Sequence, residues 1–205
     1  MAIANRTKQD VVAEFRCSSI IEAARRVFAK KGFTRATIEE VAEAAGVAKG
    51  TVYLYFPSKE AIYLAALRQG IESVHAQIRA RMAQEETTDG KIRAFIETRI
   101  RLVDENRDFF RIYYSELGNI FSLPNKLYRE LHQLYRKQET ALAEVIREGQ
   151  ARGDIRKMPP EQAARAIYEL TRGVIAERLR DGSRLSSDDE LLFLLDFIWK
   201  GIEKR

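Results

Sequence analysis

The segment from Thr37 to Lys59, TIEEVAEAAGVAKGTVYLYFPSK, constrains the fold more than any other part of the chain. Thr37 and Glu40 have the spacing of a capping box that starts a helix, and Gly46 supplies the turn that ends it. A second helix of about two turns follows. A helix so short is not stable alone and has to be held by packing. This layout is that of a helix-turn-helix, whose second helix enters the DNA major groove, so the segment predicts DNA binding.

The rest of the chain also has helical periodicity. An apolar stripe at steps of three and four residues runs from Ile20 to Phe28, and no run alternates as a strand would. We expect an all-α protein in which residues 1–60 form a helix-turn-helix domain with helices at about 11–31, 37–45 and 48–55. Residues 61–205 form a second, helical domain. Its long first helix begins after Ser58 and ends near Ala83, and further helices are expected at about 91–105, 108–117, 125–152, 160–180 and 188–204.

The positive charge is concentrated in the first third of the chain. The net charge of the 205 residues is +5. Residues 1–68 hold 11 Lys or Arg against 7 Asp or Glu, whereas the remainder holds 24 against 23. The basic excess therefore lies where phosphate contacts would be needed, although a solvated surface explains a net +4 equally well.

Several protein classes do not fit the sequence. The longest apolar run near the C-terminus, Leu191 to Trp199, is interrupted by Asp196 and is far shorter than the roughly 20 residues that span a bilayer. The N-terminus has no apolar signal segment. Cys17 is the single cysteine, so neither an intrachain disulfide nor a cysteine-rich metal site is available. We expect a cytoplasmic protein without a membrane contact, a metal or a cofactor.

Catalysis is not expected either. His75 and His132 are the only histidines, and they lie in different predicted helices. The sequence contains no HExxH, CxxC or GxGxxG motif. The segment from Gly46 to Thr51 faintly resembles a phosphate-binding loop, but its Lys precedes the second Gly and no strand leads into it. The chain is therefore predicted not to be an enzyme.

The segment from Ile20 to Leu67 strongly resembles the N-terminal DNA-binding domain of the TetR (tetracycline-repressor-like) family. The matching elements are IIEAARRVFAKKGF and ATIEEVAEAAGVAKGTVYLYFPSKEAI. One departure is Ala48, where many relatives have a Ser or Thr that helps to cap the recognition helix. The resemblance implies a homodimeric transcriptional regulator, usually a repressor, that a small molecule releases from its operator. It also implies that the second domain binds this ligand and dimerises.

Five residues are candidate DNA contacts on their own chemistry. Thr37, at the start of a helix, can offer its hydroxyl and amide to phosphate or can act only as a cap. Lys49 suits guanine, and the Thr51 methyl suits a thymine methyl. Gly50 costs about 1 kcal/mol relative to Ala inside a helix, but it lets the recognition helix approach the groove closely. Arg35 is a weaker phosphate candidate.

The family resemblance implies three further contacts: Tyr53 on phosphate or base edges, and Tyr55 and Lys59 on phosphate. The two tyrosines are about 200° apart on a helix, so one of them can instead pack in the core with Phe56. A cation in the first turn opposes the helix dipole, which favours a DNA role for Lys59 over a stabilising one. A two-fold dimer predicts a palindromic double-stranded operator with half-sites about one helical turn apart or somewhat more.

Aromatic residues are concentrated between Phe95 and Tyr135, as in an apolar pocket with a few polar groups. Arg99 and Arg172 each lie one turn after an aromatic residue, so each can place a cation beside a cavity and favour an acidic or acyl ligand. Ordinary core packing explains the same aromatics. We expect an apolar or amphipathic effector. The candidate lining residues are Phe95, Arg99, Phe110, Tyr113, Tyr114, Tyr128, Tyr168 and Arg172.

The last two predicted helices are apolar over much of their circumference, so each has to be buried on more than one side. Two such helices from each of two subunits would form a four-helix bundle, although an intrachain core would bury the same residues. The candidate dimer residues are Ile167, Leu170, Val174, Leu191, Leu194, Leu195, Ile198 and Ile202.

The expected function is that of a ligand-responsive repressor. The alternative is a ligand-independent or architectural DNA-binding protein whose second domain only dimerises. A fillable cavity among the middle helices, together with loss of DNA binding when a ligand is added, distinguishes the two.

Overall fold

The computed structural model describes residues 8–118, 125–181 and 187–204. This part of the chain is all-α, as the sequence predicts, and its one β-type pairing is an isolated bridge between Ile155 and Glu203. Its helices are α1 (Lys8–Arg35), α2 (Ile38–Ala45), α3 (Lys49–Tyr55), α4 (Lys59–Met82), α5 (Thr88–Glu105), α6 (Arg107–Gly118), α7 (Asn125–Arg152), α8 (Pro160–Asp181) and α9 (Ser187–Ile202).

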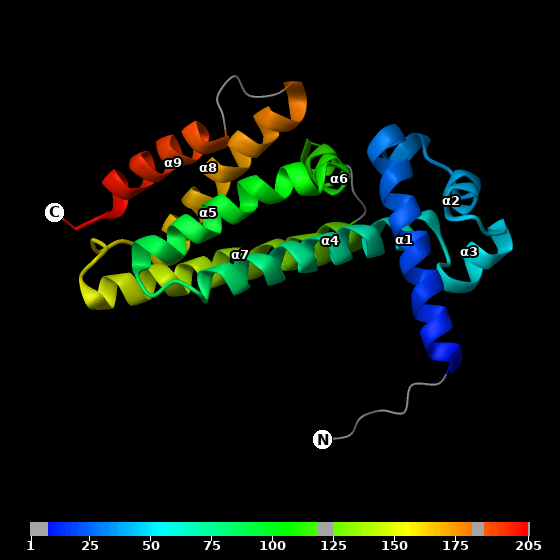
Figure 1. Cartoon of the computed structure of the whole chain (residues 1–205), viewed down its shortest axis with the longest axis horizontal. Coiled ribbons are helices and arrows are strands. Elements are labelled where there is room, and N and C mark those ends of the chain that lie inside the picture. The colour runs from blue at the N-terminus through cyan, green and yellow to red at the C-terminus, as the bar shows by residue number, and fades with distance from the viewer. Residues whose placement is uncertain (1–7, 119–124, 182–186, 205) are drawn as a thin grey trace.

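Helices α1, α2 and α3 form a group at one end of an elongated molecule (Figure 1). The hydroxyl of Thr37 accepts from the amide of Glu40 (3.3 Å), and the Glu40 carboxylate accepts from the amide of Thr37 (3.1 Å), so the predicted capping box is present. Gly46 ends α2 at φ 66°, the left-handed conformation that the turn into α3 requires. Gly32 has φ 73° and interrupts α1 where the sequence predicts the first helix to end.

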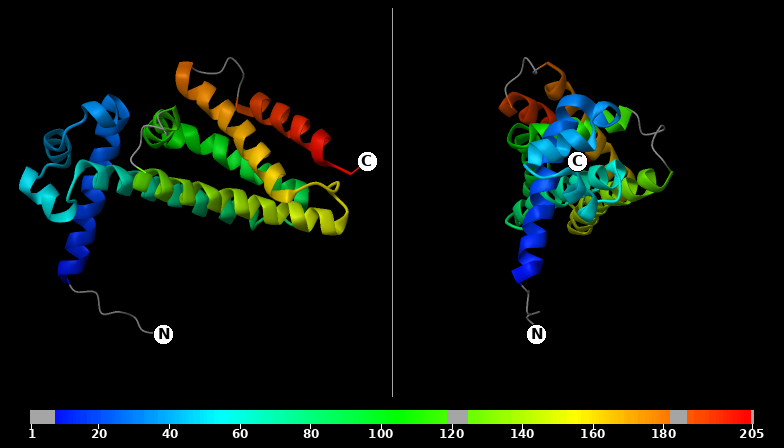
Figure 2. Two further views of the ribbon diagram at one scale, coloured as in Figure 1. Left: turned by 180° about the vertical axis from the view of Figure 1, so that it is seen from behind. Right: turned by 90° about the vertical axis from the view of Figure 1, so that its right-hand side faces the viewer.

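Helix α4 joins this group to the rest of the protein. It begins beside α1 and then lies along α5 and α7 for most of its length (Figures 1 and 2). The buried apolar side chains form one continuous cluster from Ile20 in α1 to Ile202 in α9. The division expected at residues 60 and 61 falls in the first turn of α4. A shift of α4 against α5 and α7 would therefore move the helix-turn-helix as well.

Helix α6 approaches α4 closely at Gly70. A Cβ atom on Gly70 would lie 2.1 Å from the ring of Phe109, so a larger residue could not occupy this position without displacing that ring. Phe109 is itself buried and contacts the rings of Phe110 and Tyr113, with centroids 5.1 and 5.6 Å away. The aromatic cluster of α6 thus rests directly on α4.

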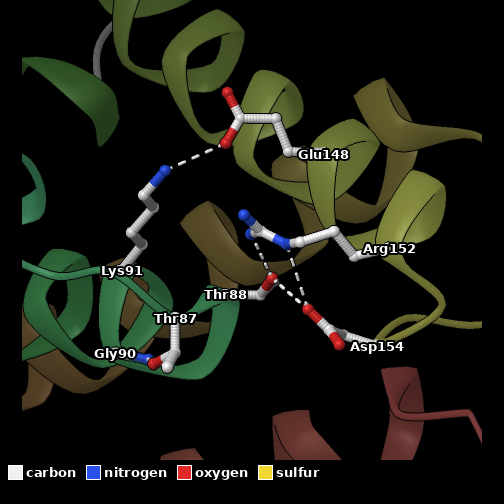
Figure 3. Close-up of polar contacts among 7 residues, drawn as sticks. All are labelled: Thr87, Thr88, Gly90, Lys91, Glu148, Arg152 and Asp154. Carbon is white, nitrogen blue, oxygen red and sulfur yellow. Dashed lines mark hydrogen bonds and ion pairs between the residues drawn. The ribbon is translucent and has the colours of Figure 1, made fainter.

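A polar network fixes the end of the bundle that lies away from α1–α3 (Figure 3). The buried Thr88 hydroxyl, at the start of α5, donates to the Asp154 carboxylate (2.7 Å) and accepts from the Arg152 guanidinium (2.6 Å). Lys91 pairs with Glu148 of α7 at 2.9 Å. These contacts hold the beginning of α5 against the end of α7. In the described ranges no helix is long and apolar enough to cross a membrane.

Candidate DNA interface and ligand site

Helix α3 exposes several of the residues that the sequence assigns to DNA. Val52 is fully buried and anchors the helix, whereas Tyr53 is 47% and Leu54 82% exposed. Lys49 and Gly50 are also exposed. A Cβ atom on Gly50 would meet no atom of the chain within 4 Å, so packing inside the protein does not require glycine there. The glycine therefore leaves the surface of α3 open at this point.

Lys49 has an acidic partner in the free protein. Its ammonium donates to the Glu39 carboxylate of α2 and lies 5.9 Å from the centroid of the Tyr53 ring. The hydrogen bond from Lys49 lowers the pKa of Glu39 and raises the pKa of Lys49, so both groups are charged at neutral pH. Both side chains are about half exposed, and such pairs add little stability. Lys49 has to leave or share Glu39 when it meets a base or a phosphate.

The other predicted DNA contacts lie around α3. Thr37 is exposed, and its hydroxyl and amide both serve the capping box. Arg35 is exposed, and its Nε donates to the carbonyl oxygen of Lys31 (3.1 Å). Thr51 is half-buried, and Tyr55 is half-buried against the hydrophobic core. The recognition helix begins at Ala48 without a side-chain cap, as the sequence predicts.

The structure shows contacts of Lys59 within the chain, and its predicted phosphate contact stays a prediction. Its ammonium donates to the carbonyl oxygens of Phe33 (2.8 Å), Thr34 (3.3 Å) and Ala36 (3.0 Å). The same nitrogen lies 4.5 Å from the centroid of the Phe33 ring. An ammonium has three donors, and here all three are used by the chain. Two of these carbonyls belong to the last turn of α1 and the third lies between α1 and α2, and all three offset the unfavourable dipole of α4 on which the sequence argument relied.

Leu54 is a candidate contact that the sequence reasoning missed. It is the most exposed large apolar residue among those described, and it lies one helical turn after Gly50. Residues four apart share a helix face, just as Lys49 and Tyr53 do. The signal in the sequence is the spacing, since Leu54 follows Gly50 by one turn and therefore lies on the same face of the recognition helix.

Two small cavities lie between α4, α5, α6, α7 and α8. Each has a volume of about 10 Å³, enough for roughly one water molecule. One is lined by Ile71, Val74, His75, Arg99, Phe109, Phe110, Tyr113, Gln138 and Tyr168. The other is lined by His75, Ile78, Arg79, Met82, Phe95, Lys137, Gln138 and Ala141. His75 and Gln138 contribute to both, so the two cavities are adjacent.

The predicted pocket residues separate into two sets. Phe95, Arg99, Phe110, Tyr113 and Tyr168 line one or other cavity. The remaining three do not line either cavity among the residues described. Tyr114 lies next to Tyr113, and burial raises the pKa of its phenol. Arg172 forms an ion pair with Glu169 at 2.6 Å. The side chain of Tyr128 lies outside the described part of the chain.

His75 and Gln138 are lining residues that the aromatic clustering did not indicate. Both are buried, and both approach the cavities from helices other than α5 and α6. Burial lowers the pKa of His75 to about 4, with the charges of Arg79, Lys137 and Arg99 adding to the effect, so its imidazole is neutral at pH 7. A buried histidine or glutamine on an amphipathic helix looks like core in the sequence, and only the packing shows what it faces.

The exposed apolar side chains of α8 and α9 include only Leu170 of the predicted dimer residues. Ile167, Leu194, Leu195, Ile198 and Ile202 are buried inside the single chain, and Val174 and Leu191 are half-buried. Both helices are apolar over a wide arc, so periodicity alone could not tell which stripe meets the protein's own core. The exposed apolar side chains are Leu170 of α8 and Leu192, Phe193 and Phe197 of α9.

The fold and the exposed recognition helix define a helix-turn-helix DNA-binding protein with a helical second part. Residues 20–66 match the family described as bacterial regulatory proteins, tetR family, and residues 85–176 match the tetracyclin repressor-like C-terminal domain. The chain belongs to the tetR family and is a DNA-binding transcriptional regulator.

The sequence identity to individual relatives is low. The chain is 25% identical to the transcriptional repressor KstR2 of Rhodococcus jostii over 142 residues, 68% of this chain and 70% of KstR2. Its fold is similar to that of the regulator FadR from Bacillus subtilis in complex with stearoyl-CoA, with a TM-score of 0.82, 20% identity and coverage of 91% and 99% of the two chains. It is equally similar to a regulator from Saccharomonospora viridis in complex with choline, with a TM-score of 0.83, 24% identity and coverage of 94% and 100%. Neighbours of the same fold thus bind unlike ligands, and the effector has to be argued from the residues of this chain.

Proposed function

We propose that this chain is a cytoplasmic, homodimeric repressor that binds a palindromic DNA operator through α2 and α3. A small molecule bound among α4–α8 releases it. The observation that carries the DNA-binding part is the outward face of α3, which presents Lys49, Gly50, Tyr53 and Leu54 while Val52 anchors the helix. Leu54 is 82% exposed on this face, and a thymine methyl in the major groove would make an apolar contact with it.

In this proposal the contacts have distinct roles. Lys49 and Leu54 read base edges, and Tyr53 lies beside Lys49 on the same face and contacts base edges or phosphate. Thr37 and Arg35, which lie at the start of α2, contact the phosphates that flank the recognition helix, as Thr51 and Tyr55 do from the sides of α3. Gly50 lets the backbone of α3 approach the floor of the groove. Lys59 takes no part in DNA contact, because its donors are used inside the chain.

The proposed dimer surface consists of Leu170, Leu192, Phe193 and Phe197. Each is at least 40% exposed in the single chain, and the rings of Phe193 and Phe197 stack with centroids 6.1 Å apart. Exposed apolar patches of this kind are typical of protein interfaces. A second copy of the chain would cover them and would set the spacing of the two recognition helices.

Selection of bound fragments from a random DNA library tests the DNA-binding part. We expect a palindromic motif, and we expect Tyr53→Ala and Leu54→Ala each to weaken binding to it about tenfold, since the dimer loses each contact twice and a tenfold change corresponds to only about 1.4 kcal/mol in total. Both side chains are exposed, so the melting temperature should stay within about 2 °C. Recovery of no motif, or normal binding by both variants, would contradict the proposal.

Light scattering tests the dimer. The variant Phe193→Asp, Phe197→Asp should be monomeric at micromolar concentration, whereas the wild type should be a dimer. The matched control is Asp196→Asn, a substitution at an exposed position of the same helix, which should leave the dimer intact. A monomeric wild-type protein would show that this surface serves another purpose.

A further inference from the structure

The interior of the second part contains a cation without an acid. Arg99, in the middle of α5, is only 3% exposed. One of its Nη atoms donates to the carbonyl oxygen of Tyr168 at 3.1 Å, and the guanidinium lies 3.9 Å from the centroid of the Tyr168 ring. A guanidinium has five N–H donors. The structure shows no further hydrogen bond and no ion pair for Arg99 among the residues that it describes, so four donors lack an acceptor there.

A buried arginine without an acidic partner lowers the stability of the fold. A buried charge destabilises the fold by several kcal/mol unless a counter-charge and hydrogen bonds compensate it. Tyr168 and Phe95 offset part of this cost, because the guanidinium lies over both rings, at 3.9 and 5.4 Å from their centroids. Contact with the faces of aromatic rings leaves the N–H edge of a guanidinium available for an acceptor in its plane. The cavity of about 10 Å³ lies beside this group.

The other polar groups around that cavity also favour an anion. His75 and Gln138 are 4% and 7% exposed, and their side chains make no hydrogen bond with the described residues. The amide of Gln138 can donate two hydrogen bonds and the neutral imidazole of His75 one. The charges of Arg79, Lys137 and Arg99, all positive, act on His75 and help to lower its pKa. No Asp or Glu is buried among the residues that the structure describes. The site therefore offers positive charge and donors, and it lacks an anion.

We propose that this site binds the anionic head group of an amphipathic ligand, with Arg99 as the bidentate partner of the head group and Gln138 and His75 as additional donors. The proposal rests on the proposed function, since the ligand would be the effector of the regulator. The apolar part of the ligand lies among Phe95, Phe109 and Phe110, which line the two cavities.

Because the cavities are small, a bound ligand has to move the side chains around them, and this movement is transmitted to the DNA-binding helices. Two spaces of about 10 Å³ hold about one water molecule each, so an apolar chain has to displace the rings around them. Phe109 is one of these rings, and it rests on Gly70 of α4 with no room for a Cβ atom between them. A displaced Phe109 pushes directly on α4, which begins beside the helix-turn-helix. Ligand binding and operator release would be coupled through this contact.

Isothermal titration calorimetry with three probes of equal chain length, decanoate, decanol and decylamine, tests the charge preference. We expect the wild-type dimer to bind decanoate at least about tenfold more tightly than decanol, because a charged bidentate pair is among the stronger polar contacts. Decylamine should not bind. The preference should disappear in Arg99→Met and should persist in the control Arg172→Met, since Arg172 is paired with Glu169 outside the cavities.

The stability of the free protein provides an independent readout. Because Arg99 is buried without an acid, Arg99→Met should have a melting temperature equal to or above that of the wild type. A fall of several degrees would mean that Arg99 is structural and would overturn the inference. In the calorimetric assay, a wild type that binds decanol as tightly as decanoate would also overturn it, and so would a wild type that binds none of the probes. Operator binding is measured separately. If the wild type binds its operator but does not prefer decanoate, only the proposed ligand class is refuted. If the wild type binds no operator, the proposed function is refuted.

Discussion

The substitution Lys59→Met distinguishes a structural lysine from a DNA-binding one. The side chain keeps its length and loses its charge. The ammonium donates to three carbonyl oxygens at the end of α1 and directly after it, two of these bonds partly buried, and lies over the Phe33 ring. Hydrogen bonds from a charged group contribute about 1.5–3 kcal/mol each when buried, but water can replace the exposed bond and part of the other two. We therefore expect the free energy of unfolding to fall by about 2–3 kcal/mol.

For a chain of this size a loss of 2–3 kcal/mol corresponds to a decrease in melting temperature of about 5–10 °C. Calorimetry or circular dichroism at fixed protein concentration measures it. The second assay is operator binding over a range of salt concentrations, well below the melting temperature. A phosphate contact contributes about 1 to the slope of log K against log salt. The slope of Lys59→Met should equal that of the wild type.

Arg35→Met is the matched control, because Arg35 is a basic residue of the same turn that is exposed to solvent. It should show the opposite pattern, with a smaller salt slope and a melting temperature within about 2 °C of the wild type. A Lys59→Met protein with unchanged stability and a reduced salt slope would refute the assignment of Lys59 to the α1–α2 turn and would restore its phosphate contact.

Three further outcomes are expected. Gly50→Ala should stabilise the fold by about 0.5–1 kcal/mol in thermal denaturation, since a Cβ atom there meets nothing in the chain, yet it should weaken operator binding. Gly70→Ala should destabilise the fold by about 1–3 kcal/mol, because a Cβ atom would overlap the Phe109 ring; unchanged stability would show that α6 is not held against α4. Burial lowers the pKa of His75 from 6.5 to about 4, so the unfolded chain binds the extra proton between these values and stability is lost as the pH falls from about 6.5 towards 4. His75→Gln should flatten that part of the stability–pH curve, and an unchanged curve would place the titration elsewhere.

Local signals predicted the helix boundaries closely. The capping box of Thr37, the turn at Gly46 and the cap at Ser58 are all present, since each depends on residues within four positions of one another. The segment 125–152 was expected as a helix, and α7 has those bounds. The start of α5 was expected three residues too late, because its cap is Thr87 and the polar run before it gave no periodicity.

The sites were less predictable, because they depend on which of several equivalent faces is used. Lys59 was assigned to DNA from its position in the chain, and the sequence did not predict its contacts with carbonyls that lie 23 to 26 residues away. The dimer residues of α8 and α9 were assigned from an apolar stripe, and the packing against α5 and α7 uses most of that stripe inside one chain. Arg99 and Arg172 look equivalent in the sequence. The fold buries the first with no acidic partner among the described residues, and it pairs the second with Glu169.

The sequence by itself determined that this protein is all-α, that it carries a helix-turn-helix from Thr37 to Lys59, and that its recognition helix presents Lys49 and Tyr53 on one face. These properties follow from periodicity, caps and turns, which are local. The tertiary structure alone decided that Lys59 contacts the end of α1, that Phe109 rests on Gly70, and that the guanidinium of Arg99 lines a cavity between α4, α5, α6, α7 and α8. Each of these depends on side chains from helices far apart in the chain, and only close packing determines which of them meet.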